Sequence, residues 1–151
     1  DVGFVFQFYN LVQNLTAEEN VELASQICKN PIPADIVLND VGLSDRMKNF
    51  PSQLSGGERR YLEAKLLLLG DTKFVLLDEP FDYLSFHLAD KLIELIKKHS
   101  VNKGIVISDH NYGKVLEVVN RLTLIREGVL LELTDKRGLV EQGYLLSESY
   151  L

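Results

Sequence analysis

The chain has 151 residues, 46% hydrophobic and 25% charged, a composition that supports one globular domain with a core and excludes intrinsic disorder. Its formal net charge of -6 disfavours nucleic-acid binding, because proteins that bind a phosphate backbone usually carry a basic face. The single cysteine, Cys28, excludes an internal disulfide and is typical of a reducing compartment such as the cytoplasm. No apolar run approaches the roughly 20 residues of a membrane-spanning helix, so we expect any membrane role to come through a partner.

Strand-like and helix-like segments alternate along the chain. Apolar, β-branched and aromatic runs predict strands at residues 2–6, 74–77, 104–107, 122–125 and 129–133. Helical periodicity predicts helices at residues 17–27, 33–41, 56–69, 86–99 and 112–119. Thr16 and Glu19 have the spacing of a capping box, and Gly42 is placed to end the second helix in a left-handed conformation. The alternation predicts an α/β layered domain with parallel central strands.

The most informative segment is the predicted helix start at residues 54–58, whose sequence is Leu-Ser-Gly-Gly-Glu. In one interpretation Ser55 caps the helix, Glu58 completes a capping box, and the glycines only permit a tight entry. In the other, Gly56 and Gly57 lack Cβ atoms and leave the first N–H groups of the helix open to an anion, which the helix dipole attracts. The two interpretations are compatible, and the second predicts a phosphate contact.

Polar side chains follow the predicted strands at the points where they end. Asp78 and Glu79 follow the strand at 74–77, His110 lies shortly after the strand at 104–107, and Gln7 follows the first strand. Nucleotides bind at the carboxyl edge of such sheets, where these side chains would meet. Taken alone, each has an ordinary alternative: a solvated acidic turn, a structural histidine, or a surface amide.

The four segments, in this order and at these spacings, resemble the C-terminal portion of the ATP-binding domain of ABC transporters, from Q-loop through signature, Walker B and H-loop. The resemblance covers nearly the whole chain, and residues 2–58 look most like the branch that serves lipoprotein release and macrolide export. It implies a partial three-layer α/β core of the P-loop NTPase type. Residues 8–70 would form its helical subdomain, and residues 1–7 and 71–151 part of the catalytic core.

The same resemblance assigns roles to single residues. Glu79 would be the general base, Gln7 would contact Mg²⁺ or the attacking water, and His110 would lie near the γ-phosphate. Asp78, with Gln7, would hold Mg²⁺. The nucleotide is ATP, and the signature residues would contact the γ-phosphate of an ATP held by an opposing subunit: Ser55, Gly56, Gly57 and Glu58.

The partners implied are a second ATPase subunit and a transmembrane subunit that docks on the Q-loop and helical subdomain. A docking surface is expected at Phe8, Tyr9, Leu11 and Val12, with local core packing as the alternative. The resemblance places the protein in the cytoplasm, peripheral to the inner membrane, and implies no nucleic-acid partner. It does not predict the transported substrate.

Several departures from the family pattern qualify this interpretation. No Gly-Lys-Ser/Thr phosphate loop (Walker A) occurs, and the N-terminal β-layer is missing with it, so we expect the chain alone to be inactive and to bind ATP weakly. Apolar surface on the strands near 74–77 and 105–107 should then be exposed and favour self-association. Ser85 replaces the usual D-loop aspartate, and residues 59–61 replace the usual glutamine and arginine.

The chain opens at Asp1 and not at Met, which suggests a fragment of a longer protein. Two alternatives to a transport ATPase stay open. One is a truncated or chimeric engineered fragment without activity. The other is a non-transport or regulatory ABC protein.

Overall fold

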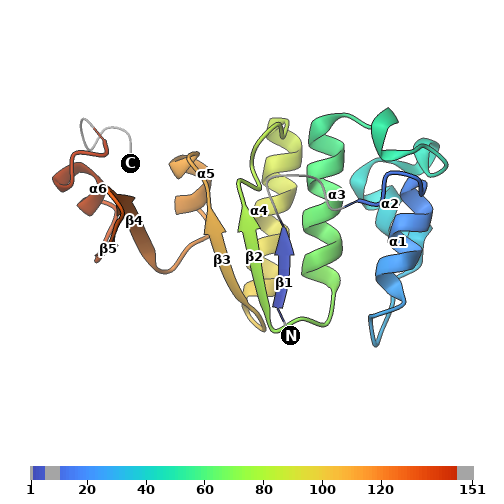
Figure 1. Ribbon diagram of the computed structural model, residues 1–151, viewed down its shortest axis with the longest axis horizontal. Helices are drawn as coiled ribbons and strands as arrows, with labels where there is room; N and C mark the ends of the chain where they lie inside the picture. The colour runs from blue at the N-terminus through green and yellow to red at the C-terminus, as the bar shows by residue number, and fades with distance from the viewer. Residues whose placement is uncertain (1, 6–10, 146–151) are drawn as a thin grey trace. The chain divides into compact units, whose positions relative to one another are not determined.

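A computed structural model of the chain describes residues 2–5 as backbone and residues 11–145 with their side chains. The chain divides into two compact units, residues 1–110 and residues 111–151 (Figure 1). Gln7, Phe8 and Tyr9, which the sequence singles out, lie outside the described residues. In the described part of the chain, no helix combines the length and the apolar character needed to cross a bilayer.

The first unit is built on a parallel sheet of three strands in the order β1-β2-β3 (Figure 1). The strands are β1 (Val2–Val5), β2 (Phe74–Asp78) and β3 (Gly104–Ser108). In their register Val5 is paired with Leu77, and Asp78 at the end of β2 is paired with Ser108 at the end of β3. The predicted parallel sheet is confirmed, and the carboxyl ends of β2 and β3 lie side by side.

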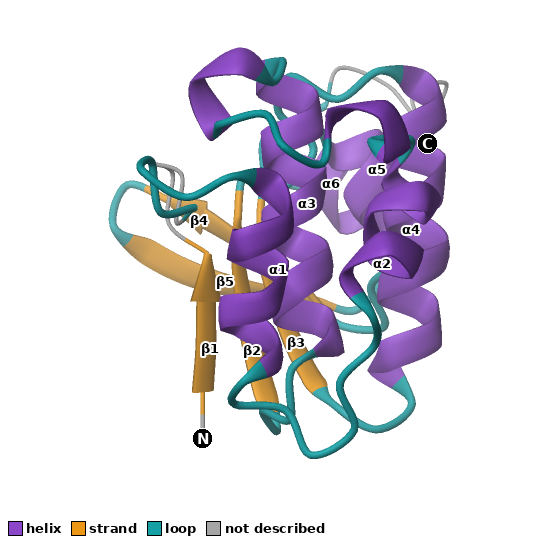
Figure 2. Cartoon of the chain, turned by 90° about the vertical axis from the view of Figure 1, so that its right-hand side faces the viewer, coloured by secondary structure: helices purple, strands orange, loops and turns teal. Residues whose placement is uncertain are grey.

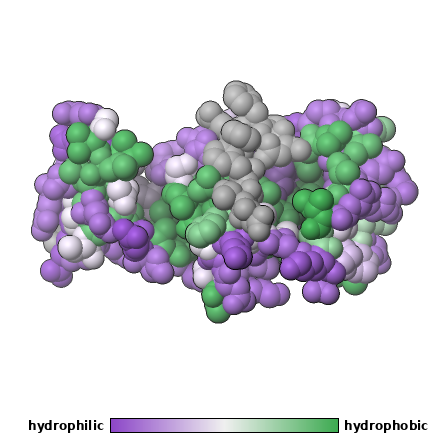
Figure 3. Space-filling view, turned by 60° about the horizontal axis from the view of Figure 1, so that its bottom comes forward, coloured by the Kyte–Doolittle hydropathy of each residue, from purple (hydrophilic) through white to green (hydrophobic). Residues whose placement is uncertain are grey.

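Two long helices, α3 (Gly56–Leu69) and α4 (Phe86–Ser100), pack against each other and on one face of this sheet (Figure 2). Side chains alternate along β2, so that Val75 and Leu77 are buried beneath the helices. On the opposite face Phe74 is 55% exposed and Val106 of β3 is 60% exposed. Hydrophobic residues also reach the surface in the space-filling view (Figure 3). Apolar surface is therefore exposed on both strands, as expected from the sequence.

A helical segment connects β1 to α3. Its elements are α1 (Ala17–Ser25), α2 (Ala34–Val41) and two 3₁₀ turns, η1 (Ser44–Arg46) and η2 (Pro51–Gln53). The predicted capping box is present, because Thr16 Oγ1 accepts a hydrogen bond from Glu19 N and Glu19 Oε2 accepts one from Thr16 N. Gly42 ends α2 at φ 80°, as predicted. The two 3₁₀ turns were not predicted.

Two buried polar side chains hold the stretch from Leu11 to Thr16. Glu63 of α3 accepts a hydrogen bond from Leu11 N at 3.1 Å, and Asn20 of α1 accepts one from Val12 N at 2.8 Å. The Asn20 amide also donates to the carbonyls of Val12, Leu15 and Thr16. Leu11 is itself buried, so for this residue the core-packing alternative is correct, whereas Val12 is 38% exposed.

The second unit contains an antiparallel hairpin, β4 (Leu122–Arg126) and β5 (Val129–Leu133). Both turn residues, Glu127 and Gly128, have positive φ (50° and 77°), which suits the twist of a two-residue hairpin turn. Two short helices flank the hairpin: α5 (Tyr112–Leu116), which is shorter than predicted, and α6 (Gly138–Glu141), which was not predicted.

Candidate functional site

The carboxyl ends of β2 and β3 are joined by hydrogen bonds that bring their polar residues together. Asp78 Oδ1 accepts a hydrogen bond from the Ser108 hydroxyl, and Glu79 N donates to Ser108 O at 2.7 Å. Glu79 has a φ of 47°, a left-handed value that is unfavourable for a residue with a side chain. The chain therefore turns sharply at Glu79, immediately after the last strand residue.

His110 is surrounded by carboxylates at this corner of the sheet. Its Nδ1 lies 3.6 Å from Glu79 Oε1 and 3.9 Å from Asp109 Oδ1, and its Nε2 lies 3.7 Å from Asp82 Oδ1. These distances are longer than direct hydrogen bonds. The His110 side chain is 68% exposed, so a ligand in solvent can reach it.

Asp109 is the buried member of this group of side chains. Its side chain is fully buried, and its Oδ2 accepts a hydrogen bond from Phe81 N at 3.1 Å. A buried carboxylate that receives a backbone N–H fixes the turn after β2 relative to the end of β3. We call Glu79, Asp82, Asp109 and His110 the acidic corner.

Glu79, Asp82 and His110 each offer a ligand atom, and these atoms lie within 4.8 Å of one another. Asp82 was not predicted as a site residue. The signal available was its place three residues after Glu79 in the same turn, but only the fold shows that it faces His110. Asp78, predicted as a metal ligand, lies beside this group with its carboxylate on the Ser108 hydroxyl. Gln7, predicted to act with it, lies outside the described residues.

The Leu-Ser-Gly-Gly-Glu segment begins α3 with a complete capping box. Ser55 Oγ accepts from Glu58 N at 3.2 Å, and Glu58 Oε2 accepts from Ser55 N at 2.8 Å. Arg46 of η1 also donates to Glu58 Oε1 at 3.0 Å. The capping interpretation is therefore correct, with the Ser55 oxygen and the Glu58 carboxylate acting as hydrogen-bond acceptors. The N–H groups at Gly56 and Gly57, in the first turn, carry the positive end of the helix dipole.

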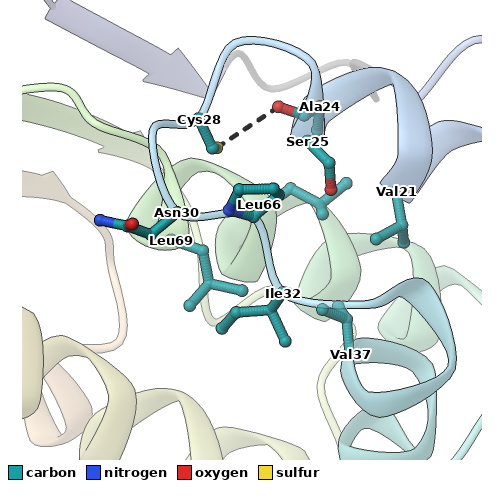
Figure 4. Close-up of a pocket in the computed structure, with 10 residues that line it drawn as sticks. Val21, Ala24, Ser25, Cys28, Asn30, Ile32, Val37, Leu66 and Leu69 are labelled. Carbon is teal, nitrogen blue, oxygen red and sulfur yellow. Dashed lines mark hydrogen bonds between the residues drawn. The ribbon is translucent and has the colours of Figure 1, made fainter.

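A small pocket in the helical segment is not a candidate for a nucleotide. Its volume is about 40 Å³, far smaller than the usual pocket for a ligand of nucleotide size. Figure 4 shows the side chains that line it. Its lining is largely apolar and includes Val21, Cys28, Ile32, Val37, Leu66 and Leu69. The Cys28 thiol donates a hydrogen bond to Ala24 O at 3.4 Å. A pocket of this size reflects the packing of the helices.

The model of the ABC transporter family matches residues 1–82 of the chain. An uncharacterized ABC transporter ATP-binding protein of Thermotoga maritima is 38% identical over 148 residues, covering 92% of this chain. The methionine import ATP-binding protein MetN of Streptococcus pneumoniae is 33% identical over 87% of this chain. The macrolide export ATP-binding/permease protein MacB of Brucella abortus is 34% identical over 91% of it.

The chain spans only part of each relative: 61% of the Thermotoga protein, 39% of MetN and 22% of MacB. A solved dimeric ATP-binding cassette in a post-hydrolysis state, bound to ADP and Pi, superposes with a TM-score of 0.70 and 28% identity, covering 89% of this chain and 63% of that one. A solved ATP-binding subunit of an ABC transporter superposes with a TM-score of 0.76 over 99% of this chain and 66% of that one. At 22% identity, the second likeness concerns the fold.

Proposed function

Since the chain belongs to the ABC transporter family of ATP-binding proteins, with the partial α/β fold of a P-loop NTPase, we propose that the protein containing it hydrolyses ATP to drive membrane transport. The observation that carries this proposal is the acidic corner. It places a carboxylate that can accept a proton, Glu79, beside an exposed histidine, His110, at the carboxyl edge of a parallel sheet.

Glu79 is the proposed general base. Its side chain is 30% exposed, so water can reach the carboxylate, and the sharp turn at its positive φ directs it away from the strand. His110 is proposed to donate a hydrogen bond to the γ-phosphate of ATP. A donor aimed at a transferring phosphoryl group stabilises the charge that it carries in the transition state. Gln7 is proposed from the family resemblance to orient the same water.

Asp78 and Gln7 are the proposed ligands of Mg²⁺. The fit is chemical: the Asp78 carboxylate and the Ser108 hydroxyl supply oxygen atoms, which Mg²⁺ prefers, at the paired ends of β2 and β3. When bound, Mg²⁺ neutralises phosphate charge. Asp78 is held in place by the Ser108 hydroxyl, so the carboxylate is already oriented before a cation arrives.

The N-terminus of α3 is the proposed contact for a second ATPase subunit. Ser55, Gly56, Gly57 and Glu58 would face the γ-phosphate of an ATP held by that subunit, since first-turn N–H groups and the helix dipole attract an anion. The solved relative bound to ADP and Pi is dimeric, which supports a two-subunit arrangement.

A transmembrane subunit is the proposed partner of the Q-loop and the helical subdomain, residues 8–70, with residues 1–7 and 71–151 belonging to the catalytic core. MetN and MacB are named for import and export, which supports a membrane transporter without selecting a direction. This arrangement places the ATPase domain on the cytoplasmic side of the membrane. The 151 residues contain no Gly-Lys-Ser/Thr phosphate loop, so we expect no hydrolysis by this chain alone.

The test is a Glu79→Gln variant of the intact protein. If Glu79 is the base, ATP turnover falls by about 10²- to 10⁴-fold while nucleotide binding is retained, because the amide keeps the shape of the side chain and loses its basicity. Glu94→Gln, an exposed position on α4, is the matched control and should hydrolyse ATP at the normal rate. Unchanged hydrolysis by Glu79→Gln would show that the base has been misassigned.

A further inference from the structure

The N-terminus of α3 lies directly against the turn that follows β2. A Cβ atom placed on Gly57 would lie 2.6 Å from the carbonyl oxygen of Tyr83 and 3.5 Å from Leu84 Cα. Real Cβ atoms essentially never approach another atom closer than 3.0 Å. Gly57 is buried, and the atom in the way belongs to the backbone, so no side-chain rotation relieves the contact. Only glycine fits at this position while the turn keeps its shape.

The turn itself is strained at the residue that makes this contact. Tyr83 has a φ of 62°, a left-handed value that a residue with a side chain adopts rarely. Its ring does not account for this conformation, since Tyr83 is 76% exposed. What is packed is its backbone carbonyl, which rests on Gly57. The strained conformation therefore coincides with the close approach of the turn to α3.

The other side of the same turn carries the acidic corner. Phe81 N donates to the buried carboxylate of Asp109, and Asp82 Oδ1 lies 3.7 Å from His110 Nε2. Residues 80–84 are therefore held between the N-terminus of α3 and the end of β3. A shift of the Tyr83 carbonyl would be passed along a few backbone bonds to Asp82.

We propose that Gly57 is a positioning residue for the acidic corner. Because Gly57 lacks a Cβ, the Tyr83 carbonyl can pack against α3. This contact determines where Asp82 lies relative to His110. The N-terminus of α3 and the acidic corner of one chain then move together, so that a displacement of one displaces the other. The catalytic meaning of this link rests on the proposed function, whereas the contact itself does not.

The first test is Gly57→Ala in this chain, read by amide NMR shifts. We expect the amide resonances of residues 81–84 and of His110 to move. Gly70→Ala is the matched control at the other end of α3, where φ is -61° and the nearest atom to an added Cβ is 3.4 Å away. Its shifts should stay within about one helical turn of residue 70. If Gly57→Ala leaves residues 81–84 and His110 at their original positions, the proposal is overturned.

The second test is a double-mutant cycle with Tyr83→Gly, which removes the side chain that opposes a positive φ and lets the turn retreat. Gly57→Ala alone should lower the melting temperature by roughly 5 °C or more. The same substitution in the Tyr83→Gly background should lower it by less than half as much. If Gly57→Ala alone fails to fold, recovery of cooperative melting in the double variant supports the proposal.

The proposal is overturned if Gly57→Ala lowers the melting temperature equally with and without Tyr83→Gly. It is also overturned if Gly57→Ala fails to fold and Tyr83→Gly does not restore cooperative melting. Neither measurement uses ATP. A negative result in the double-mutant cycle therefore does not bear on the proposed ATP hydrolysis. Likewise, a failure of the proposed hydrolysis in the intact protein does not bear on the contact between Gly57 and Tyr83.

Discussion

Asn20 provides the sharpest test of how the first unit is held together. Its side chain is buried, with 5% of the residue exposed, and it accepts from Val12 N while donating to the carbonyls of Val12, Leu15 and Thr16. The amide has two hydrogens for three carbonyls, so Asn20→Ala removes the equivalent of three hydrogen bonds. At about 1 kcal/mol each, the loss is about 3 kcal/mol.

Water recovers part of this loss, because Val12 is 38% exposed and its hydrogen bond to Asn20 is only partly buried. We therefore expect the free energy of unfolding to fall by about 2 to 3 kcal/mol. The melting temperature should fall by roughly 5 to 10 °C. Urea denaturation followed by circular dichroism measures the first quantity, and the exchange rate of the Val12 amide should rise with it.

Asn14→Ala is the control, since this asparagine is exposed in the same connection, and its effect should stay within about 0.5 kcal/mol. If Asn20→Ala were as mild as Asn14→Ala, the inference that a buried amide anchors this segment would be wrong.

Three further predictions concern the chain as a whole. Burial, together with Lys103 and Lys98, lowers the pKa of His99, so its contribution to stability is complete above the unfolded value near 6.5 and is lost as the pH falls through the lowered pKa. Unfolding free energies measured across this range should depend less on pH in His99→Gln, and an equal dependence would contradict the assignment. Calorimetry of the chain with Mg-ATP should show no low-micromolar binding, because the Walker A loop normally supplies most of the phosphate contacts; tight binding would refute this. Light scattering should show self-association that Phe74→Lys weakens and Val101→Lys, at an exposed valine following α4, does not; a stable monomer at high concentration would refute it.

Most of the fold was predictable because its signals are local. Thr16 with Glu19, and Ser55 with Glu58, lie three residues apart and form the capping boxes that their spacing indicates. Ser85 likewise caps α4, with its hydroxyl accepting from Leu88 N, although the carboxylate usual in the family is absent. Alternation of strands with helices was enough to predict the parallel order of the sheet.

Most of what the sequence did not predict depends on contacts between distant residues. Glu63 accepts from Leu11 across 52 positions, and no local pattern marks a glutamate inside a helix as buried. Asp82 joins the acidic corner only because β2 and β3 end together. The short elements η1, η2 and α6 span three or four residues each, too few to show any periodicity. The roles of Gln7, Asp78, Glu79 and His110 stay predictions.

The pairing of β1 with β2 has a consequence for how the chain folds during synthesis. β1 precedes its partner β2, which begins at Phe74, and β3 follows at Gly104. On the ribosome, the helical segment between them emerges whole before β1 can pair, so α1 and α2 can form early from local contacts. During this time β1 lacks its partner β2. Until α3 and β2 have been synthesised, the edge of β1 that pairs with β2 is unpaired and can bind a chaperone.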